Sequence, residues 1–186
     1  MWYTRKGDGG TTGLFGTKER MPKDHPLFEA LGSVDELNSL IGLCSAYVRE
    51  CNDHAITLNR LGQAQEGLFL VQAELAGADK RINQTHVDVL ETLIGDIEGC
   101  IEKPKSFVVP GATVLSALFD YTRTVSRRAE RCVLRAQNTK EISAEMRSYL
   151  NRLSSLFYAL ARYVAQTSGV AERPPTYDLK NVMHDI

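Results

Sequence analysis

Four arginines crowd one short stretch of this sequence. They are Arg123, Arg127, Arg128 and Arg131, and the stretch 122–131 contains no lysine. The planar guanidinium group of arginine forms paired hydrogen bonds with phosphate or carboxylate oxygens. The stretch therefore suits a phosphate-binding pocket. A solvated helix face, a network of salt bridges and a nucleic-acid surface are the alternatives.

The spacing of these residues predicts one helix with two opposed faces. At about 100° per residue, Arg123, Arg127 and Arg131 fall within an arc of about 80°, and Arg128 falls to one side. The opposite face is apolar and is expected to face the core: Leu118, Val125, Ala129, Cys132, Val133 and Ala136. Three arginines this close repel one another unless an anion or a partner's acids lie between them.

Two acidic residues lie on or beside the arginine face. Asp120 is placed three residues before Arg123, and Glu130 three residues after Arg127. Pairs at this spacing usually stabilise a helix by about 0.2–0.5 kcal/mol each. An ordinary salt-bridged surface is therefore the plain interpretation of the pattern.

Two further segments carry polar residues opposite an apolar face. In residues 142–168, Asn151 and Arg162 fall together on the side away from Leu153 and Leu160, so we expect both at the surface. Asn151 could hydrogen-bond a ribose or phosphate there. In residues 29–50, Asp35 lies opposite the apolar face, near a helix N-terminus that favours an acid.

The N-terminal stretch TRKGDGGTTG offers a second anion-binding element. Glycine lets backbone amides approach an anion closely, and threonine hydroxyls add donors. The stretch matches neither the P-loop nor the dinucleotide-binding pattern, and a flexible leader is its plain interpretation. Two anion-binding elements in one chain of net charge −1 favour a phosphate-containing ligand.

Apolar periodicity predicts five helices, over residues 29–50, 55–78, 84–102, 112–137 and 142–168. The second is expected to bury Leu58, Leu61, Leu68, Phe69 and Leu75. FVV at 107–109 is the only strand-like run. The predicted fold is an all-α, five-helix bundle, ferritin-like and up-and-down, with a glycine-rich N-terminal loop. One domain is expected: a nucleotide-binding loop (1–25), the bundle (29–168) and a loose tail (169–186).

Composition narrows the function classes. The 186 residues are 43% hydrophobic with a net charge of −1, which argues against a nucleic-acid-binding or membrane protein. The four cysteines lack the spacing of a zinc site, no signal-peptide core is evident, and we expect a cytoplasmic protein. No Glu-x-x-His motif supports a di-metal carboxylate site.

Four blocks of the sequence, in this order, resemble the PduO-type ATP:cob(I)alamin adenosyltransferases. They are YTRKGDGGTTGLFG, PKDHPLFEALGSVDELNSLIG, SFVVPGAT, and RTVSRRAERCVL with YLNRLSSLFYALAR. The resemblance implies a homotrimer of five-helix bundles with active sites at the subunit interfaces. It implies transfer of the 5′-deoxyadenosyl group of ATP to the cobalt of reduced cobalamin, with release of triphosphate. Mg²⁺ is expected on the phosphates.

The resemblance also implies residue roles. ATP contacts are expected for Thr4, Arg5, Lys6, Gly7, Asp8, Gly10, Thr12, Gly13, Lys23, Arg127, Arg128, Glu130, Arg131 and Asn151. Arg127 is also counted among the catalytic residues, with Asp35, Arg123 and Phe107. Asp35 and Arg123 would pair across the interface beside the corrinoid. Phe107 would press on its lower face and keep the dimethylbenzimidazole ligand off cobalt.

The sequence departs from the family pattern at two positions. Leu27 stands where many relatives have arginine, and Ala112 replaces a glycine of the commoner PGGT. Both differences concern affinity for the corrinoid. A cob(II)alamin reductase and an adenosylcobalamin-dependent enzyme are the implied partners. The alternative function is a non-catalytic trimer that binds and delivers adenosylcobalamin.

Overall fold

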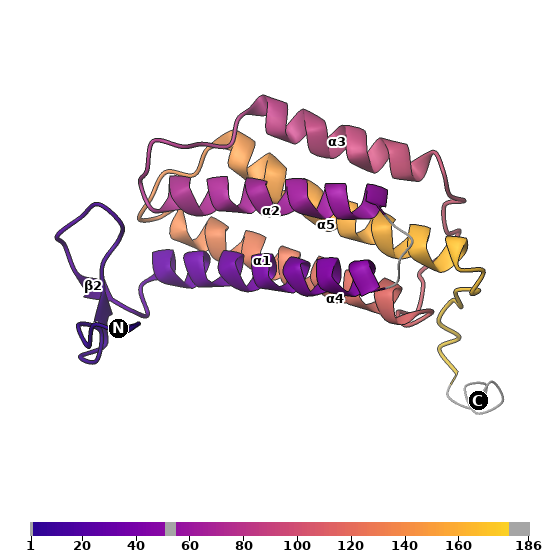
Figure 1. Cartoon of the computed structure of the whole chain (residues 1–186), viewed down its shortest axis with the longest axis horizontal. Coiled ribbons are helices and arrows are strands. Elements are labelled where there is room, and N and C mark those ends of the chain that lie inside the picture. Colours follow the sequence, from indigo (N-terminus) through magenta and orange to yellow (C-terminus); the bar gives the residue numbers. More distant parts are fainter. Residues whose placement is uncertain (1, 51–54, 179–186) are drawn as a thin grey trace.

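The computed structural model describes residues 2–50 and 55–178 and consists of a helical bundle with a short hairpin beyond one end (Figure 1). The helices are α1 (Pro26–Glu50), α2 (Ala55–Leu75), α3 (Gln84–Glu98), α4 (Val114–Ala136) and α5 (Ala144–Thr167). Successive helices run in alternating directions along the bundle. The prediction of an all-α, five-helix, up-and-down fold is confirmed.

The N-terminal stretch contains a small element that the sequence did not predict. β1 (Thr11–Thr12) and β2 (Met21–Pro22) pair antiparallel, with Thr11 opposite Pro22 and Thr12 opposite Met21. The strand-like run 107–109 is not a strand. We call residues 2–25 the N-terminal segment. It projects beyond the end of the bundle at which α1 begins (Figure 1).

Local signals set where the helices begin and end. α4 starts with a capping box, in which Thr113 Oγ1 accepts from the Ser116 amide at 3.0 Å and Ser116 Oγ accepts from the Thr113 amide at 2.9 Å. α2 ends at Leu75, short of the predicted 78, because Gly77 adopts a left-handed conformation with φ of 86°. α3 also ends earlier than predicted, at Glu98 rather than at residue 102.

The core lies where α4 packs against α5 and α1. Its fully buried members include Leu37, Ile41, Phe119, Val133, Leu153 and Phe157. The predicted core face of α4 is confirmed for Val125, Ala129, Cys132, Val133 and Ala136. The prediction for Phe69 is wrong: its side chain is 59% exposed, because α2 buries the stripe of Leu61, Leu68 and Val71 instead.

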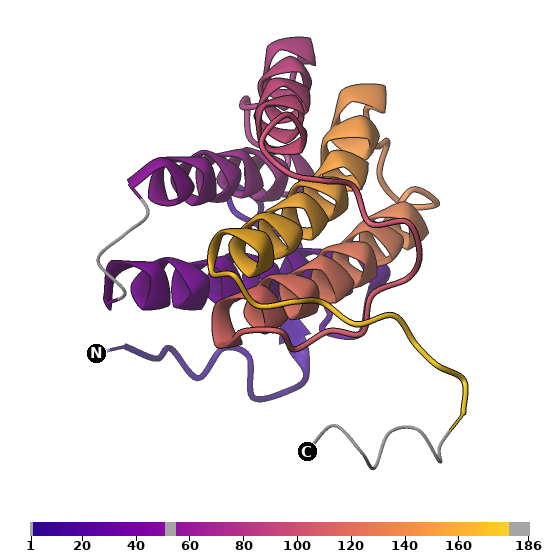
Figure 2. The ribbon, with the colours of Figure 1, turned by 90° about the vertical axis from the view of Figure 1, so that its right-hand side faces the viewer.

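The loop before α4 and the tail after α5 cross the same end of the bundle (Figure 2). The Val109 amide donates to the Arg173 carbonyl at 2.9 Å. The first part of the tail is thus bonded to the bundle, which differs from the expected loose tail. Residues 179–186 of that tail and Cys51 lie outside the described residues.

Two glycines of α2 provide a test of the packing. A Cβ on Gly67 would lie 1.9 Å from the hydroxyl of Tyr149, whose side chain is 2% exposed. We expect Gly67→Ala to lower the free energy of unfolding by about 1–3 kcal/mol. A Cβ on Gly62, in the same helix, would meet nothing within 4 Å.

Gly62→Ala is therefore the matched control, expected to raise the free energy of unfolding by about 0.5–1 kcal/mol through helix propensity. Urea denaturation followed by circular dichroism measures both variants. Equal stability of the two variants would contradict the packing of α2 on Tyr149.

Candidate functional site

The N-terminal segment is folded back on itself around one arginine. Arg20 Nη2 donates to the carbonyls of Lys6 at 2.6 Å and Thr11 at 2.7 Å, and its Nε donates to Thr11 Oγ1 at 3.0 Å. The Lys23 amide donates to the Gly10 carbonyl at 3.0 Å. The glycine-rich run is therefore tied to the strand that follows it. Sequence analysis missed Arg20, because a lone arginine outside the glycine-rich run carries no motif.

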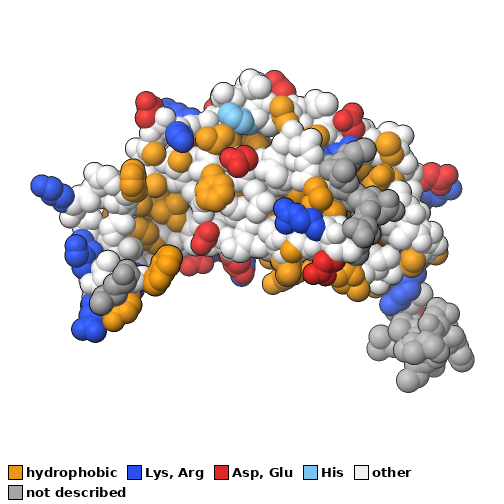
Figure 3. Space-filling view, viewed as in Figure 1, with side chains coloured by type: hydrophobic (Ala, Val, Ile, Leu, Met, Phe, Trp, Pro, Cys, Tyr) orange, Lys and Arg blue, Asp and Glu red, His pale blue; other side chains and the backbone are white. Residues whose placement is uncertain are grey.

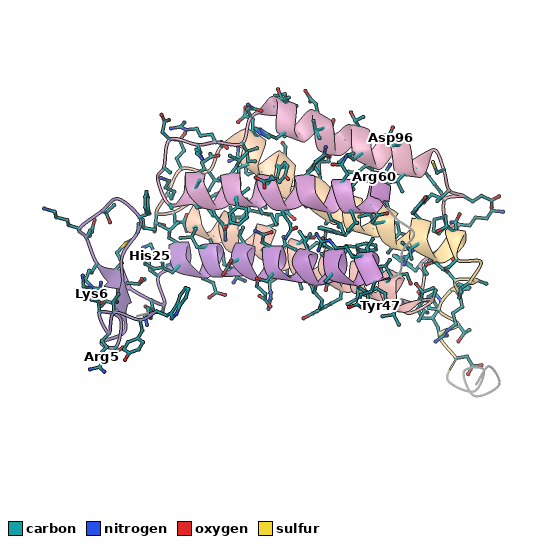
Figure 4. All side chains as sticks on the ribbon, in the orientation of Figure 1. Arg5, Lys6, His25, Tyr47, Arg60 and Asp96 are labelled. Carbon is teal, nitrogen blue, oxygen red and sulfur yellow. The ribbon has the colours of Figure 1, made fainter. Side chains whose placement is uncertain are left out.

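This arrangement brings the first group of expected ATP residues together. The group comprises Thr4, Arg5, Lys6, Gly7, Asp8, Gly10, Thr12, Gly13 and Lys23. A Cβ on Gly7 would lie 3.1 Å from Lys23 Nζ, so Lys23 lies directly against the loop. Gly10 has φ of +76°, a conformation that favours glycine. Arg5 and Lys6 lie at the projecting end of the molecule, where cations gather (Figures 3 and 4).

The arginine face of α4 points away from the core, as predicted. Arg127, Arg128 and Arg131 are exposed and Arg123 is partly exposed. Arg128 forms an ion pair with Glu36 of α1, consistent with its place to one side of the other three. Within the described part of the chain, Arg127 and Arg131 form no ion pair. Two exposed arginines thus keep their charge free for an anion.

A polar pair joins α4 to α5 beside these arginines. Asn151 Nδ2 donates to Glu130 Oε1 at 3.1 Å, and Asn151 is exposed as predicted. The structure therefore brings two of the expected ATP residues into contact. The suggested Arg127–Glu130 pair is absent from the ion pairs of the described residues. Glu130 instead uses its carboxylate to hold Asn151.

The predicted surface position of Arg162 is wrong. Its side chain is 2% exposed, with Nη2 at 2.5 Å from Asp120 Oδ2 and Nε at 2.8 Å from Glu172 Oε1. Asp120 was placed on the charged face of α4 and is also buried, at 4% exposed. The tail covers this part of the bundle, so a helical wheel of α5 alone cannot show that its polar side is enclosed.

Asp120 also makes the contact that the i,i+3 spacing suggested. Its Oδ1 lies 3.9 Å from Arg123 Nε. Burial raises the pKa of Glu172, and the Asp120 charge acts in the same direction, whereas Arg162 opposes the shift. Asp35 is exposed on α1, and no ion pair joins it to Arg123 within the described chain.

Phe107 is an exposed apolar residue at the opposite end from the N-terminal segment. Its side chain is 80% exposed and lines a broad hollow of about 640 Å³. The loop of Phe107 precedes α4, whereas the N-terminal segment precedes the antiparallel α1 (Figure 1). The two are separated by the length of α4, about 34 Å for its 23 residues.

The thiol of Cys44 is not a candidate nucleophile. Cys44 is buried, and its Sγ lies 3.3 Å from Thr122 Oγ1. Burial raises the pKa of Cys44, so the thiol stays protonated and packs as a small apolar group. The site therefore offers cations, amides and the exposed ring of Phe107, which suit binding and orientation rather than covalent catalysis.

Comparison with known proteins decides the family. A family model described as cobalamin adenosyltransferase matches residues 2–164 of the chain. The chain belongs to the cobalamin adenosyltransferase family. The match includes the N-terminal segment, the loop of Phe107 and the arginine face of α4.

Individual members of the cobalamin adenosyltransferase family agree with this assignment. The corrinoid adenosyltransferase of Citrobacter freundii is 38% identical over 175 residues, covering 90% of this chain and 97% of that protein. The corrinoid adenosyltransferase PduO of Salmonella typhimurium is 35% identical over 86% of this chain. This chain covers 48% of that relative's length.

A solved member of the family has the same fold. It is a phenylalanine-to-alanine variant of a PduO-type ATP:corrinoid adenosyltransferase from Lactobacillus reuteri, complexed with cobalamin and ATP. The TM-score is 0.84 at 28% identity, covering 95% of this chain and 99% of the other. In the present chain, no helix among the described residues is long and apolar enough to cross a membrane.

The role of Arg20 in shaping the N-terminal segment is testable. We expect Arg20→Ala to speed amide hydrogen exchange at Lys23 about tenfold, because the three hydrogen bonds that hold the loop against β2 are lost. Exchange in the five helices should not change. Lys18→Ala, which removes a nearby exposed cation, is the control. Unchanged exchange at Lys23 in Arg20→Ala would show that the segment holds its shape without this residue.

Proposed function

We propose that this chain transfers the 5′-deoxyadenosyl group of ATP to the cobalt of a reduced corrinoid, cob(I)alamin, and releases triphosphate. The observation that carries the proposal is the family match over residues 2–164. The solved relative complexed with cobalamin and ATP supports the choice of both substrates. Arg127 and Arg131 are exposed and form no ion pair with the described residues, so they supply the positive charge that a phosphate chain requires.

The chemistry needs no protein nucleophile. The electron pair of cobalt(I) attacks the ribose C5′, a cobalt–carbon bond forms, and the C5′–oxygen bond breaks with its electrons going to triphosphate. The protein must hold two large substrates in line and stabilise the negative charge that leaves. Arginine guanidinium groups and backbone amides of a glycine-rich loop are suited to the second task.

We assign the nucleotide to two groups of residues. The first is the N-terminal segment, with Thr4, Arg5, Lys6, Gly7, Asp8, Gly10, Thr12, Gly13 and Lys23. The second is the outer face of α4 and α5, with Arg127, Arg128, Glu130, Arg131 and Asn151. The Asn151–Glu130 hydrogen bond supports the second group, because it fixes an amide beside the arginines.

Mg²⁺ would accompany the phosphates. Among the described residues, no group of three His, Cys, Asp or Glu side chains could hold a metal ion. Triphosphate oxygens and water are sufficient ligands for Mg²⁺, which commonly binds through substrate phosphates and few protein groups. The ion would reduce the repulsion between the phosphates as triphosphate departs.

The corrinoid side of the site is assigned to Phe107, Asp35 and Arg123. A side chain that is 80% exposed and apolar is costly to leave in water, and it suits packing against the flat lower face of a corrin ring. Such packing would exclude water and the dimethylbenzimidazole ligand from cobalt. Loss of that ligand makes cobalt(II) easier to reduce, which is the energetically difficult step.

The position of these residues supports a homotrimer with sites between subunits. Within one chain, Phe107 and the N-terminal segment lie at opposite ends of the bundle (Figure 1). A site that uses both therefore needs a second copy of the chain. Asp35, which forms no ion pair with the described residues, and the partly exposed Arg123 are assigned to a salt bridge across that interface.

The cellular setting follows from the chemistry. We place the protein in the cytoplasm, and the free thiols of Cys44, Cys100 and Cys132 are compatible with a reducing compartment. The reaction consumes cob(I)alamin, so a cob(II)alamin reductase must supply it. An adenosylcobalamin-dependent enzyme would use the product.

The role of Arg127 is tested by adenosyl transfer under anaerobic conditions. Chemically reduced cob(I)alamin, ATP and Mg²⁺ are mixed with the protein, and loss of the cob(I)alamin absorbance is followed. We expect Arg127→Ala to lower kcat/KM by about 100-fold, as for removal of a donor that stabilises transition-state charge. Arg135→Ala, an exposed arginine later on the same helix, is the control. A silent wild-type protein that still binds the corrinoid would favour the delivery function.

Subunit mixing tests whether the site is shared. Lys6→Ala and Phe107→Ala are each expected to be nearly inactive. When the two are unfolded together and refolded as mixed trimers, about a quarter of the sites would combine an intact Lys6 with an intact Phe107 from different chains. Activity near that fraction of wild type is expected. No recovery in mixed trimers would place both residues of a site on one chain.

A further inference from the structure

A continuous series of charged side chains crosses the end of the bundle that carries Phe107. Glu172 contacts Arg162 at 2.8 Å, Arg162 contacts Asp120 at 2.5 Å, and Asp120 lies 3.9 Å from Arg123. We call these four residues the ionic chain. It begins in the tail, passes through α5 and α4, and ends at a residue assigned to the corrinoid side of the site.

The interior of the ionic chain is closed to solvent, whereas its last member is not. The side chains of Arg162 and Asp120 are 2% and 5% exposed, and that of Arg123 is 33% exposed. Arg162 also lies over the ring of Tyr158, at 4.9 Å from the ring centroid. The buried members therefore have one defined geometry, and the guanidinium group of Arg123 can still reach a ligand or a neighbouring subunit.

The loop that carries Phe107 is held by α5 and by the tail. Gln166 of α5 donates to the Glu102 carbonyl at 2.7 Å and accepts from the Glu102 amide at 3.0 Å. At the other side of Phe107, the Val109 amide donates to the carbonyl of Arg173, the residue after Glu172. Phe107 and Glu172 line one hollow. The tail thus touches the loop directly and touches Arg123 through the ionic chain.

Stability alone is a poor reason for this arrangement. Burying an ion pair costs desolvation that the attraction between the charges only partly offsets, so apolar residues often serve stability equally well. Four charges of alternating sign instead fix several elements relative to one another. Here the fixed elements are the tail, α5 and the start of α4.

We propose that Glu172, Arg162 and Asp120 are positioning residues for the corrinoid side of the site. The contact between Glu172 and Arg162 holds the tail against the loop and so fixes the position of Phe107. Arg162 also holds Asp120, which in turn fixes the side chain of Arg123. The inference rests on the proposed function, because it takes Phe107 and Arg123 to contact the corrinoid. None of the residues assigned to the nucleotide belongs to the ionic chain.

The test compares Glu172→Gln with wild type in the full-length protein. The substitution keeps the shape of the side chain and removes the charge that holds the tail, while Arg162 keeps Asp120. Hydrogen exchange of the Val109 amide reports on the loop, and equilibrium binding of cob(II)alamin and of ATP reports on the site. We expect exchange at Val109 to be about tenfold faster and cob(II)alamin affinity about tenfold lower. ATP affinity should stay within about twofold.

Two further variants separate positioning from general destabilisation. Glu172→Asp keeps the charge and should recover part of the corrinoid affinity. Glu74→Gln removes the charge of a buried glutamate elsewhere in the bundle, which accepts from the Ile82 amide at 3.0 Å and belongs to α2. It should change neither exchange at Val109 nor the binding of cob(II)alamin.

Three outcomes would contradict the positioning role. Unchanged exchange at Val109 in Glu172→Gln overturns the proposal, and so does faster exchange with unchanged cob(II)alamin affinity. Equal losses of ATP and cob(II)alamin affinity also overturn it. If the wild type binds cob(II)alamin but transfers no adenosyl group, the transferase function fails, and the affinities of the variants still decide the positioning role.

Discussion

Helix α4 packs against both α1 and α5, and its 23 residues must serve the core and a ligand site at the same time. Its apolar stripe is buried, so every charged residue it carries is forced to the remaining face. That constraint lines up Arg123, Arg127 and Arg131 without any dedicated loop. The rigidity of a packed helix then fixes the distances between these cations before a ligand arrives.

The antiparallel course of the helices has a second consequence. Because α1 and α4 run in opposite directions, the segments that precede them lie at opposite ends of the bundle (Figure 1). One segment carries the glycine-rich loop and the other carries Phe107. A packed helical bundle cannot bend to bring its ends together, so a site that combined these groups, as proposed, would need more than one copy of the chain.

Much of this could be predicted from periodicity. The apolar faces of α1 and α4 follow a regular spacing, so the exposed positions of Asp35, Arg127 and Arg131 follow from the sequence alone. Helix ends were less accurate, because the left-handed turn at Gly77 is set by local backbone geometry. The position of Arg162 was predicted wrongly because the spacing of residues within one helix does not show that the tail covers it. Arg20 carried no signal, since its partners are backbone carbonyls.

Arg162 and Asp120 were both expected on charged, exposed faces, and both are buried for the same physical reason. A charged side chain is expected at the surface because burying it alone is costly, and that expectation fails when opposite charges arrive from distant segments. Asp120 and Glu172 are separated in sequence, and only folding brings both to Arg162. An arginine that is 2% exposed between two acids marks a point where three segments must meet in one arrangement. In this chain those segments are the ones that hold Phe107 and Arg123, so under the proposed function the buried charges lie where precise placement would matter for binding a large, flat substrate.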